Sequence, residues 1–286
     1  KAFKEYMKAM MSNKNRWCVI AVPTAAWATK VFKNLSEQEA VEKLWQAIFD
    51  ACRINDGDPV QQWEEHQARL EKRMNFLNES AFDALHFKNS KGTDITVGLV
   101  KNHIWASGRE EAQDGVGFIA NIPTEEVFTT PHKDKINGTV RSSKPLNRNG
   151  IFIDDFYFTL KDGKIVDFGA KTGYDALAEI LKTDEGILSF GEVALVAANS
   201  PISNMNFLFL NTLFDENASC HFALGEAYPS CIKGGNQMTE EELEQNGCNR
   251  SLDHIDFMFG TDDMEITGIK SNGETVQLFK NGNWAI

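Results

Sequence analysis

The sequence predicts an α/β N-terminal domain, present in part, followed by an α+β domain that is rich in β-strands. Up to about residue 105, apolar strand-like runs alternate with amphipathic helical segments. From about residue 106, short β runs alternate with Asn-Gly, Asp-Gly and Gly-Asn turns. The chain has 286 residues and 42% hydrophobic content, which is enough for more than one core. We therefore expect two domains, 1–105 and 106–286.

The first domain should begin with a strand and continue with two helices. Residues 16–23 form an apolar run that ends at a proline, which is typical of a buried strand. Ser36 and Glu39 have the spacing of a capping box, so a helix should start there and end near Cys52. Asp58-Pro59 should start a longer helix with an apolar face. Residues 94–100 alternate like a strand.

The second domain should consist mainly of antiparallel hairpins. Asn-Gly and Asp-Gly pairs supply the positive φ that tight hairpin turns require. Such pairs stand at 137–138, 162–163, 272–273 and 281–282. We expect a clear helix over 174–181 and a short, acidic helix over 239–245.

Charge and cysteine content exclude several classes of function. The net charge of −12 disfavours binding to nucleic acid and to anionic membranes. No stretch reaches 18 apolar residues, so no transmembrane span is predicted. Five irregularly spaced cysteines without a Cys-x-x-Cys pair favour free thiols in a reducing cytoplasm. The chain begins with Lys1 and not with Met, and an expected helix over 3–11 follows almost at once, so we expect its natural N-terminus to lie further upstream.

The run His254-Ile255-Asp256 is the most informative motif. On a strand, alternation places His254 and Asp256 on one face and Ile255 on the other. An imidazole and a carboxylate that face the same way are two ligands for a divalent transition metal. A simple hydrogen-bonded His-Asp pair would explain the motif equally well.

Three upstream residues carry charge or an imidazole in apolar or proline-punctuated segments. Glu126 lies between Pro123 and Phe128, Glu192 opens a continuous apolar strand, and His221 follows small residues. Burying such groups is costly unless a partner or a metal neutralises them. Each has an ordinary alternative: a turn glutamate, a salt-bridged core glutamate or a satisfied core histidine.

Neighbouring residues fit a site less well. Glu125 should be solvated, and alternation turns Cys220 and Asp253 away from the proposed ligands. The remaining histidines lie in a charged helix face or near loops, so we expect them at the surface: His66, His86, His103 and His132. No dinucleotide fingerprint, Walker loop, His-Glu-x-x-His motif or Gly-x-Ser-x-Gly elbow is present.

Taken together, the candidates balance the charge of two divalent ions. Three carboxylates contribute −3, a bridging hydroxide −1 and two ions +4, so the sum is zero. Such neutrality allows the whole group to lie in a dry cleft.

Four separated motifs, in the right order, resemble those of the thermophilic aminopeptidase family of metallopeptidases. They lie at residues 121–129, 188–196, 215–221 and 254–260, and the resemblance covers nearly the whole chain. The family has more of the α/β domain upstream of Lys1. The resemblance implies two catalytic ions, zinc or cobalt, peptide substrates, and a homodimer whose catalytic domains enclose a cavity.

The resemblance also implies the roles of individual residues. The metal ligands would be Glu126, Glu192, His221, His254 and Asp256, and Tyr228 would supply an active-site hydroxyl. We expect Glu192 to bridge the ions and Glu126 to act as terminal ligand or proton shuttle, although these two roles could be reversed. Domain 106–286 would then be the catalytic, metal-binding one.

The expected activity is removal of N-terminal residues from peptides by a metal-activated water. Two alternatives stay open at the level of sequence. One is an inactive, metal-loaded relative that binds peptides or regulates a partner. The other is a dinuclear hydrolase for a different amide or an ester.

Overall fold

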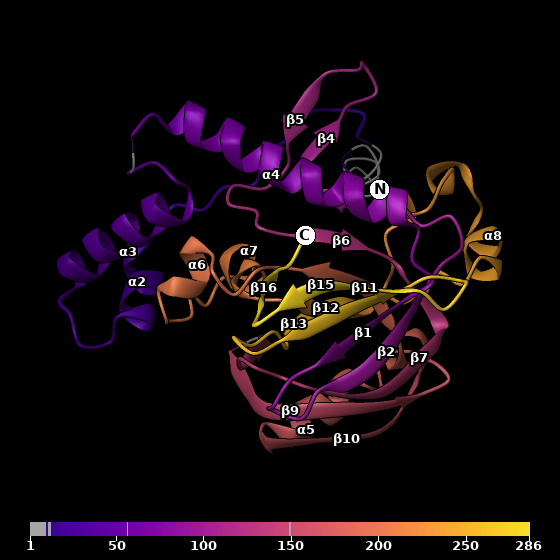
Figure 1. Cartoon of the computed structure of the whole chain (residues 1–286). Helices are drawn as coiled ribbons and strands as arrows, with labels where there is room; N and C mark the ends of the chain where they lie inside the picture. The colour runs from indigo at the N-terminus through magenta and orange to yellow at the C-terminus, as the bar shows by residue number, and fades with distance from the viewer. Residues whose placement is uncertain (1–9, 11–12, 56, 149) are drawn as a thin grey trace.

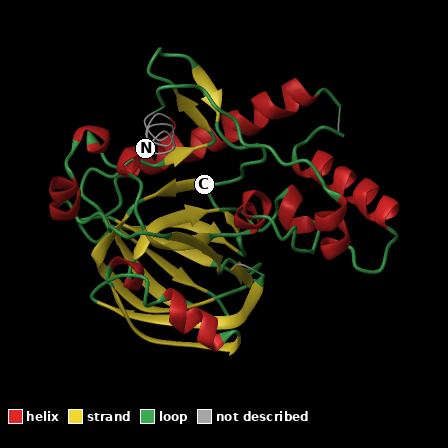
Figure 2. Cartoon of the chain, turned by 180° about the vertical axis from the view of Figure 1, so that it is seen from behind, coloured by secondary structure: helices red, strands yellow, loops and turns green. Residues whose placement is uncertain are grey.

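The computed structural model describes residues 10, 13–55, 57–148 and 150–286. A group of helices lies to one side of a β-sandwich, and one long helix, α4, crosses above the sandwich (Figures 1 and 2). The helix expected over 3–11 lies outside the described residues, apart from Met10. No helix in the described part of the chain has the length and apolar content needed to cross a membrane.

The helices of the described chain are mostly short. They are α2 (Ala25–Val31), α3 (Glu37–Ala51), α4 (Pro59–Ser80), α5 (Tyr174–Ile180), α6 (Pro201–Asn204), α7 (Thr212–Asp215) and α8 (Glu240–Gln245). Four 3-10 turns accompany them: η1 (Gly186–Leu188), η2 (Glu216–Ala218), η3 (Pro229–Cys231) and η4 (Gly235–Gln237). Helices α2, α3, α6 and α7 share a small apolar cluster that includes Leu44, Ile48 and Phe214.

One layer of the sandwich is an antiparallel sheet of nine strands. Its order is β10-β9-β7-β2-β1-β14-β15-β16, with β8 also pairing with β9. The strands are β1 (Ala84–Lys88), β2 (Asp94–Leu99), β7 (Pro131–Arg141), β8 (Leu146–Arg148), β9 (Ile151–Lys161), β10 (Lys164–Thr172), β14 (Glu265–Ile269), β15 (Thr275–Lys280) and β16 (Asn283–Trp284).

The other layer is an antiparallel sheet of five strands in the order β13-β12-β11-β6-β3. Its members are β3 (Ala106–Ser107), β6 (Val127–Thr129), β11 (Phe190–Leu195), β12 (His221–Gly225) and β13 (His254–Met258). A separate hairpin joins β4 (Arg109–Glu111) to β5 (Gly117–Ile119).

Phenylalanine rings fill the space between the two sheets. Phe87 from the nine-stranded sheet meets Phe222 from the five-stranded sheet at 5.3 Å between ring centroids. Phe222 also stacks on Phe190 at 4.8 Å and on Phe259 at 4.1 Å. All four rings are fully buried. This core fixes one face of the five-stranded sheet, so the opposite face is free to carry other chemistry.

Helix starts and hairpin turns follow the sequence predictions. Ser36 and Glu39 form a reciprocal capping box, and Cys52 is the C-cap of that helix. Asp58 caps α4, and Thr239 caps α8. The turns predicted at 162–163, 272–273 and 281–282 all join neighbouring antiparallel strands.

Two local predictions are wrong. Residues 16–23 do not form a buried strand: Val19 makes only an isolated bridge to Asn121, and Ile20 is 64% exposed. In the described chain this apolar run has no sheet edge to join, and apolarity alone cannot supply one. The Asn137-Gly138 pair lies inside β7, where the Gly138 φ of 125° is accommodated within the strand.

The described fold is mixed α/β and rich in β-structure. Strands β1 and β2, from the first 105 residues, pair with β14 and β7 in the nine-stranded sheet. The expected division into 1–105 and 106–286 stays a prediction. The observed pairing shows that the sandwich itself uses residues from both sides of that boundary.

Candidate metal centre

Strand register places four of the five predicted ligands on one face of the five-stranded sheet. Glu192 pairs with Ala223, and Ala223 pairs with Asp256, so these positions form a row across three strands. His221 lies two residues before Ala223, and His254 lies two residues before Asp256. Side chains two apart on a strand share a face, so all four project away from the phenylalanine core.

Small residues leave room on this face. Ala194 stands opposite His221, Ala223 stands between Glu192 and Asp256, and Gly225 stands opposite His254. Larger side chains at these positions would fill the space above the sheet. Because small residues alternate with the candidate ligands, the sheet surface between the polar groups carries no bulky side chain.

A β-bulge at Gly191 sets the direction of Glu192. The register between β11 and β12 shifts between Phe190 and Glu192, so Gly191 is the extra residue. A Cβ on Gly191 would lie 2.1 Å from the carbonyl oxygen of Glu226, which no side chain tolerates. Glycine therefore lets Phe190 stay in the core while Glu192 turns to the opposite face.

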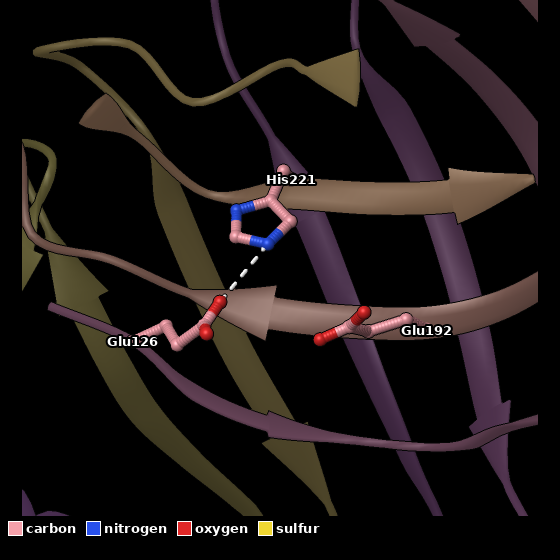
Figure 3. Close-up of side chains that lie close together, drawn as sticks. All are labelled: Glu126, Glu192 and His221. Atoms are coloured by element: carbon pink, nitrogen blue, oxygen red, sulfur yellow. Dashed lines mark ion pairs between the residues drawn. The ribbon is translucent and has the colours of Figure 1, made fainter. Parts of the chain in front are cut away.

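Glu126 joins the group from outside the regular strand. It immediately precedes β6, and its carboxylate turns toward His221 and Glu192 (Figure 3). Glu126 Oε2 lies 3.1 Å from His221 Nε2. The side chains of Glu126, Glu192 and His221 are all buried, which is costly for carboxylates without a positive partner.

The second half of the group surrounds His254. His254 Nε2 lies 3.1 Å from Glu192 Oε2 and 3.2 Å from Asp256 Oδ1. Among the described residues, two sets have ligand atoms within 4.8 Å of one another: Glu126, Glu192 and His221, and Glu192, His254 and Asp256. Glu192 belongs to both sets, so the two ligand sets meet at its carboxylate.

Both imidazoles are oriented as metal ligands are. His221 Nδ1 lies 3.1 Å from the carbonyl oxygen of Ser219, and His254 Nδ1 lies 2.7 Å from that of Glu226. A carbonyl only accepts hydrogen bonds, so each Nδ1 carries the proton. Each Nε2 then faces the carboxylates, and its lone pair would be available to a metal ion held among them, the arrangement that backbone carbonyls impose on metal-bound histidines.

The electrostatics of the group favour positive charge. Burial opposes protonation of His221, but Glu126 and the other carboxylates raise its pKa to about 10. For His254, burial is likewise outweighed by Asp256 and Glu192, and its pKa rises to about 11. Burial raises the pKa of Glu192, and the charges of Glu126 and Asp256 add to this. Buried carboxylates and imidazoles that face one another in this way are suited to bind divalent cations.

Tyr228 lies beside this group. Its hydroxyl is 3.3 Å from His254 Nε2, and its ring is 4.8 Å from the imidazole ring. Burial raises the pKa of Tyr228 well above its usual value, and Glu192 and Asp256 add to the shift. The phenol therefore stays protonated and can donate a hydrogen bond.

The sequence reasoning missed Glu216. Burial raises the pKa of this carboxyl well above its usual value, and the charges of Asp256 and Glu126 add to the shift. Glu216 therefore interacts electrostatically with the cluster that the five predicted ligands form. The available signal was its place in the segment 215–221, five residues before His221, where an acid stands close to apolar and small residues.

The sequence prediction of solvent exposure is wrong for two residues, Glu125 and His66. Glu125 is buried against Arg53, and His66 is only 2% exposed. Cys220 does turn to the other side of the sheet, toward Val196. Asp253 is also engaged elsewhere, in an ion pair with Arg148. His86, His103 and His132 are partly exposed.

Comparison with known proteins gives a consistent picture. The chain is 50% identical to aminopeptidase 2 of Geobacillus stearothermophilus over 284 residues, covering 99% of this chain and 68% of the relative. It is 40% identical to aminopeptidase T of Thermus aquaticus, covering all of this chain and 69% of the relative.

Solved structures agree with these sequences. The wild-type AmpT structure from Thermus thermophilus superimposes with a TM-score of 0.93 at 38% identity, over the whole chain and 69% of that structure. A 2,5-dihydroxypyridine dioxygenase from Pseudomonas putida KT2440 has a TM-score of 0.58 at 11% identity, over all of this chain and 76% of its own, and shares the fold alone. The family described as thermophilic metalloprotease (M29) matches residues 1–284, and the chain belongs to that family.

Proposed function

We propose that the chain is a metallo-aminopeptidase that uses two divalent ions, zinc or cobalt, to release N-terminal residues from peptides. Family membership and relatives named aminopeptidases support the peptidase activity. The observation that carries the two-ion proposal is that two ligand sets share one carboxylate, Glu192. Glu126 and His221 would complete one ion site, and His254 and Asp256 the other.

Divalent ions held by these residues would supply a water of lowered pKa and would polarise the carbonyl of the scissile peptide bond. The chain's own residues do the rest. Glu192 orients the two ligand sets toward each other, and the carbonyl of Glu226 holds His254 in its metal-binding tautomer. The buried setting excludes bulk water and strengthens every charge interaction within it.

Proton transfer requires a carboxylate that is not fully occupied as a ligand. Glu126 is close to His221 Nε2 and is better suited to bind an ion. We assign the proton shuttle to Glu216, whose carboxyl lies near enough to Asp256 and Glu126 for their charges to act on it. In its ionised form it would accept a proton from the attacking water and pass that proton to the leaving amine.

Tyr228 is assigned to the developing oxyanion. Its raised pKa keeps the hydroxyl protonated, and its position next to His254 directs it at the cluster. Such a donor strengthens its hydrogen bond as charge develops on the carbonyl oxygen. An inactive peptide-binding relative would not need this hydroxyl, so the complete set of groups favours the enzyme.

The free α-amine of the substrate would provide recognition, which makes the enzyme an exopeptidase with broad side-chain tolerance. A homodimer and a cytoplasmic location are part of the same proposal. We also propose that the chain divides near residue 105 into two domains, with the catalytic residues in 106–286.

The test combines metal content with peptide hydrolysis. The protein should hold two ions per chain by elemental analysis and release N-terminal leucine from short peptides. Acetylation of the peptide's amine should abolish release, and cleavage of the blocked peptide would contradict the exopeptidase assignment. His254→Ala should lose one ion and most activity. Full metal and full rate in that variant would show that the ligand assignment is wrong.

A further inference from the structure

The backbone around Glu126 is held by side chains from distant parts of the chain. His66 Nε2, from α4, donates to the carbonyl of residue 124 at 2.7 Å. Asn217 Oδ1, from η2, accepts from the backbone N–H of residue 125 at 2.7 Å. Ser107 Oγ, from β3, donates to the carbonyl of Glu126 at 2.8 Å. In the described part of the chain, residues 124–126 pair with no strand, so these side chains take the place of sheet pairing.

Glu125, next to the ligand Glu126, is held by a two-pronged ion pair with Arg53. Arg53 Nη2 donates to Glu125 Oε2 at 2.9 Å, and Arg53 Nη1 lies 2.6 Å from Glu125 Oε1. The two side chains are only 11% and 8% exposed. The first contact is a hydrogen bond and the second a close charge contact, so the guanidinium holds both oxygens of the carboxylate in a fork. Glu125 is thereby held away from the metal centre that its neighbour faces.

The backbone of Arg53 is unusual for its residue type. The N–H of Ile54 bonds to the carbonyl of Phe49, and the N–H of Arg53 bonds to that of Asp50. These two bonds end α3 in a Schellman motif, with Arg53 at the left-handed position, φ 56°. Glycine is favoured there because a Cβ is strained at positive φ. Arginine accepts that strain here, and its side chain makes the buried fork.

Helix α4 joins the same assembly. Trp63 Nε1 donates to the carbonyl of Cys52, at the end of α3, at 2.7 Å. One turn further along α4, His66 reaches residue 124. The ends of the helical layer and the segment that carries Glu126 therefore form one buried unit.

We propose that Arg53 and Glu125 are a positioning pair that aims Glu126 at one of the two ions. The inference rests on the proposed two-ion function. Loss of the fork should weaken binding of the ion held by Glu126 and His221, because Glu126 loses its fixed neighbour. The ion held by His254 and Asp256 should be unaffected, since the strands that carry its ligands, β11 and β13, contribute no residue to this unit. The expected loss is about 10- to 100-fold in affinity, the usual effect of removing support behind a metal ligand.

The experiment isolates each ion in a separate background. His254→Ala should retain the ion of Glu126 and His221, and His221→Ala should retain the other. Zinc is titrated into each metal-free protein by calorimetry, with and without Arg53→Gln. The substitution should weaken zinc binding in the His254→Ala background and leave it unchanged in the His221→Ala background.

Arg141→Gln is the matched control. It breaks an arginine-aspartate pair of 2.7 Å, with Asp155, in the nine-stranded sheet. It should leave zinc binding unchanged in both backgrounds. Equal affinity with and without Arg53→Gln would overturn the positioning role, as would equal weakening in both backgrounds. Wild-type protein that binds fewer than two ions would overturn the two-ion function as well, so the two failures differ.

Arg53→Lys covers the case in which Arg53→Gln fails to fold. Lysine keeps the charge but cannot form the fork, so it should fold and show a smaller weakening at the same ion. Wild-type zinc affinity in Arg53→Lys, together with unfolding of Arg53→Gln, would assign the pair to stability alone and overturn the proposal.

Discussion

Acid should destabilise this protein through His66, and the size of the effect follows from its pKa. The ring is buried, and burial together with the charge of Arg53 lowers its pKa to about 3 from 6.5. The unfolded chain therefore takes up a proton below pH 6.5 that the folded chain refuses until about pH 3. Stability is lost as pH falls through this window, and the two values give a loss of about 2 kcal/mol between pH 8 and pH 5.

His66→Gln tests this directly, because the amide keeps an N–H donor for the carbonyl of Thr124 but does not titrate. Urea unfolding at pH 8, 7 and 5 gives the free energy of unfolding for both proteins. The measurement uses metal-free protein, so that competition between protons and metal ions does not contribute. Wild type should lose about 2 kcal/mol more than the variant between pH 8 and pH 5.

An internal control comes from the alkaline end of the series. Between pH 8 and pH 7 the imidazole is mostly neutral in both states, so the two proteins should change in parallel. The absolute stability of the variant does not affect the comparison, because the quantity compared is the change in the free energy of unfolding with pH in each protein. Equal losses in wild type and variant down to pH 5 would refute the reasoning and place the His66 pKa near its ordinary value.

Three further predictions concern the metal centre. Tyr228→Phe should lower kcat by about 10²–10³-fold while metal content stays at the wild-type level; loss of metal would show a structural role for the hydroxyl. Gly191→Ala should lower metal content and activity, because its Cβ would meet the Glu226 carbonyl that orients His254; full metal by elemental analysis would count against the bulge argument. Chelation should abolish peptide hydrolysis and lower Tm, and zinc at 100 times its Kd should restore about 2.7 kcal/mol of stability; an unchanged Tm would mean that no ion binds the folded state selectively.

Features with a local cause could be predicted from the sequence. The capping box of Ser36 and Glu39 needs only a spacing of three, and hairpin turns need only residues that accept positive φ. Alternation correctly separated Asp256 from Ile255, because strand geometry fixes the faces. The convergence of Glu126 with the strand ligands required more than this: it came from the family resemblance, and the structure shows the bulge and turns that produce it.

The errors have a common physical origin. The sequence assigned Glu126 to the cluster and Glu125 away from it, and the structure agrees. The sequence could not show that both side chains are buried. Burial of Glu125 depends on Arg53, which is 72 positions away, and burial of His66 depends on a backbone carbonyl 58 positions away. Local pattern assigns a side chain to a face, whereas only tertiary contacts decide what covers that face.

That distinction explains why the support around Glu126 is less visible in sequence than the ligands themselves. A ligand must be one of a few residue types, so its chemistry marks it. A supporting contact needs only a donor or acceptor in the right place, and a backbone carbonyl serves as well as a side chain. Arg53 is the exception, because its left-handed backbone favours glycine and its side chain is buried in an ion pair. A strained backbone conformation at a non-glycine residue lowers local stability. It persists where the surrounding contacts, here the buried ion pair, hold a specific geometry.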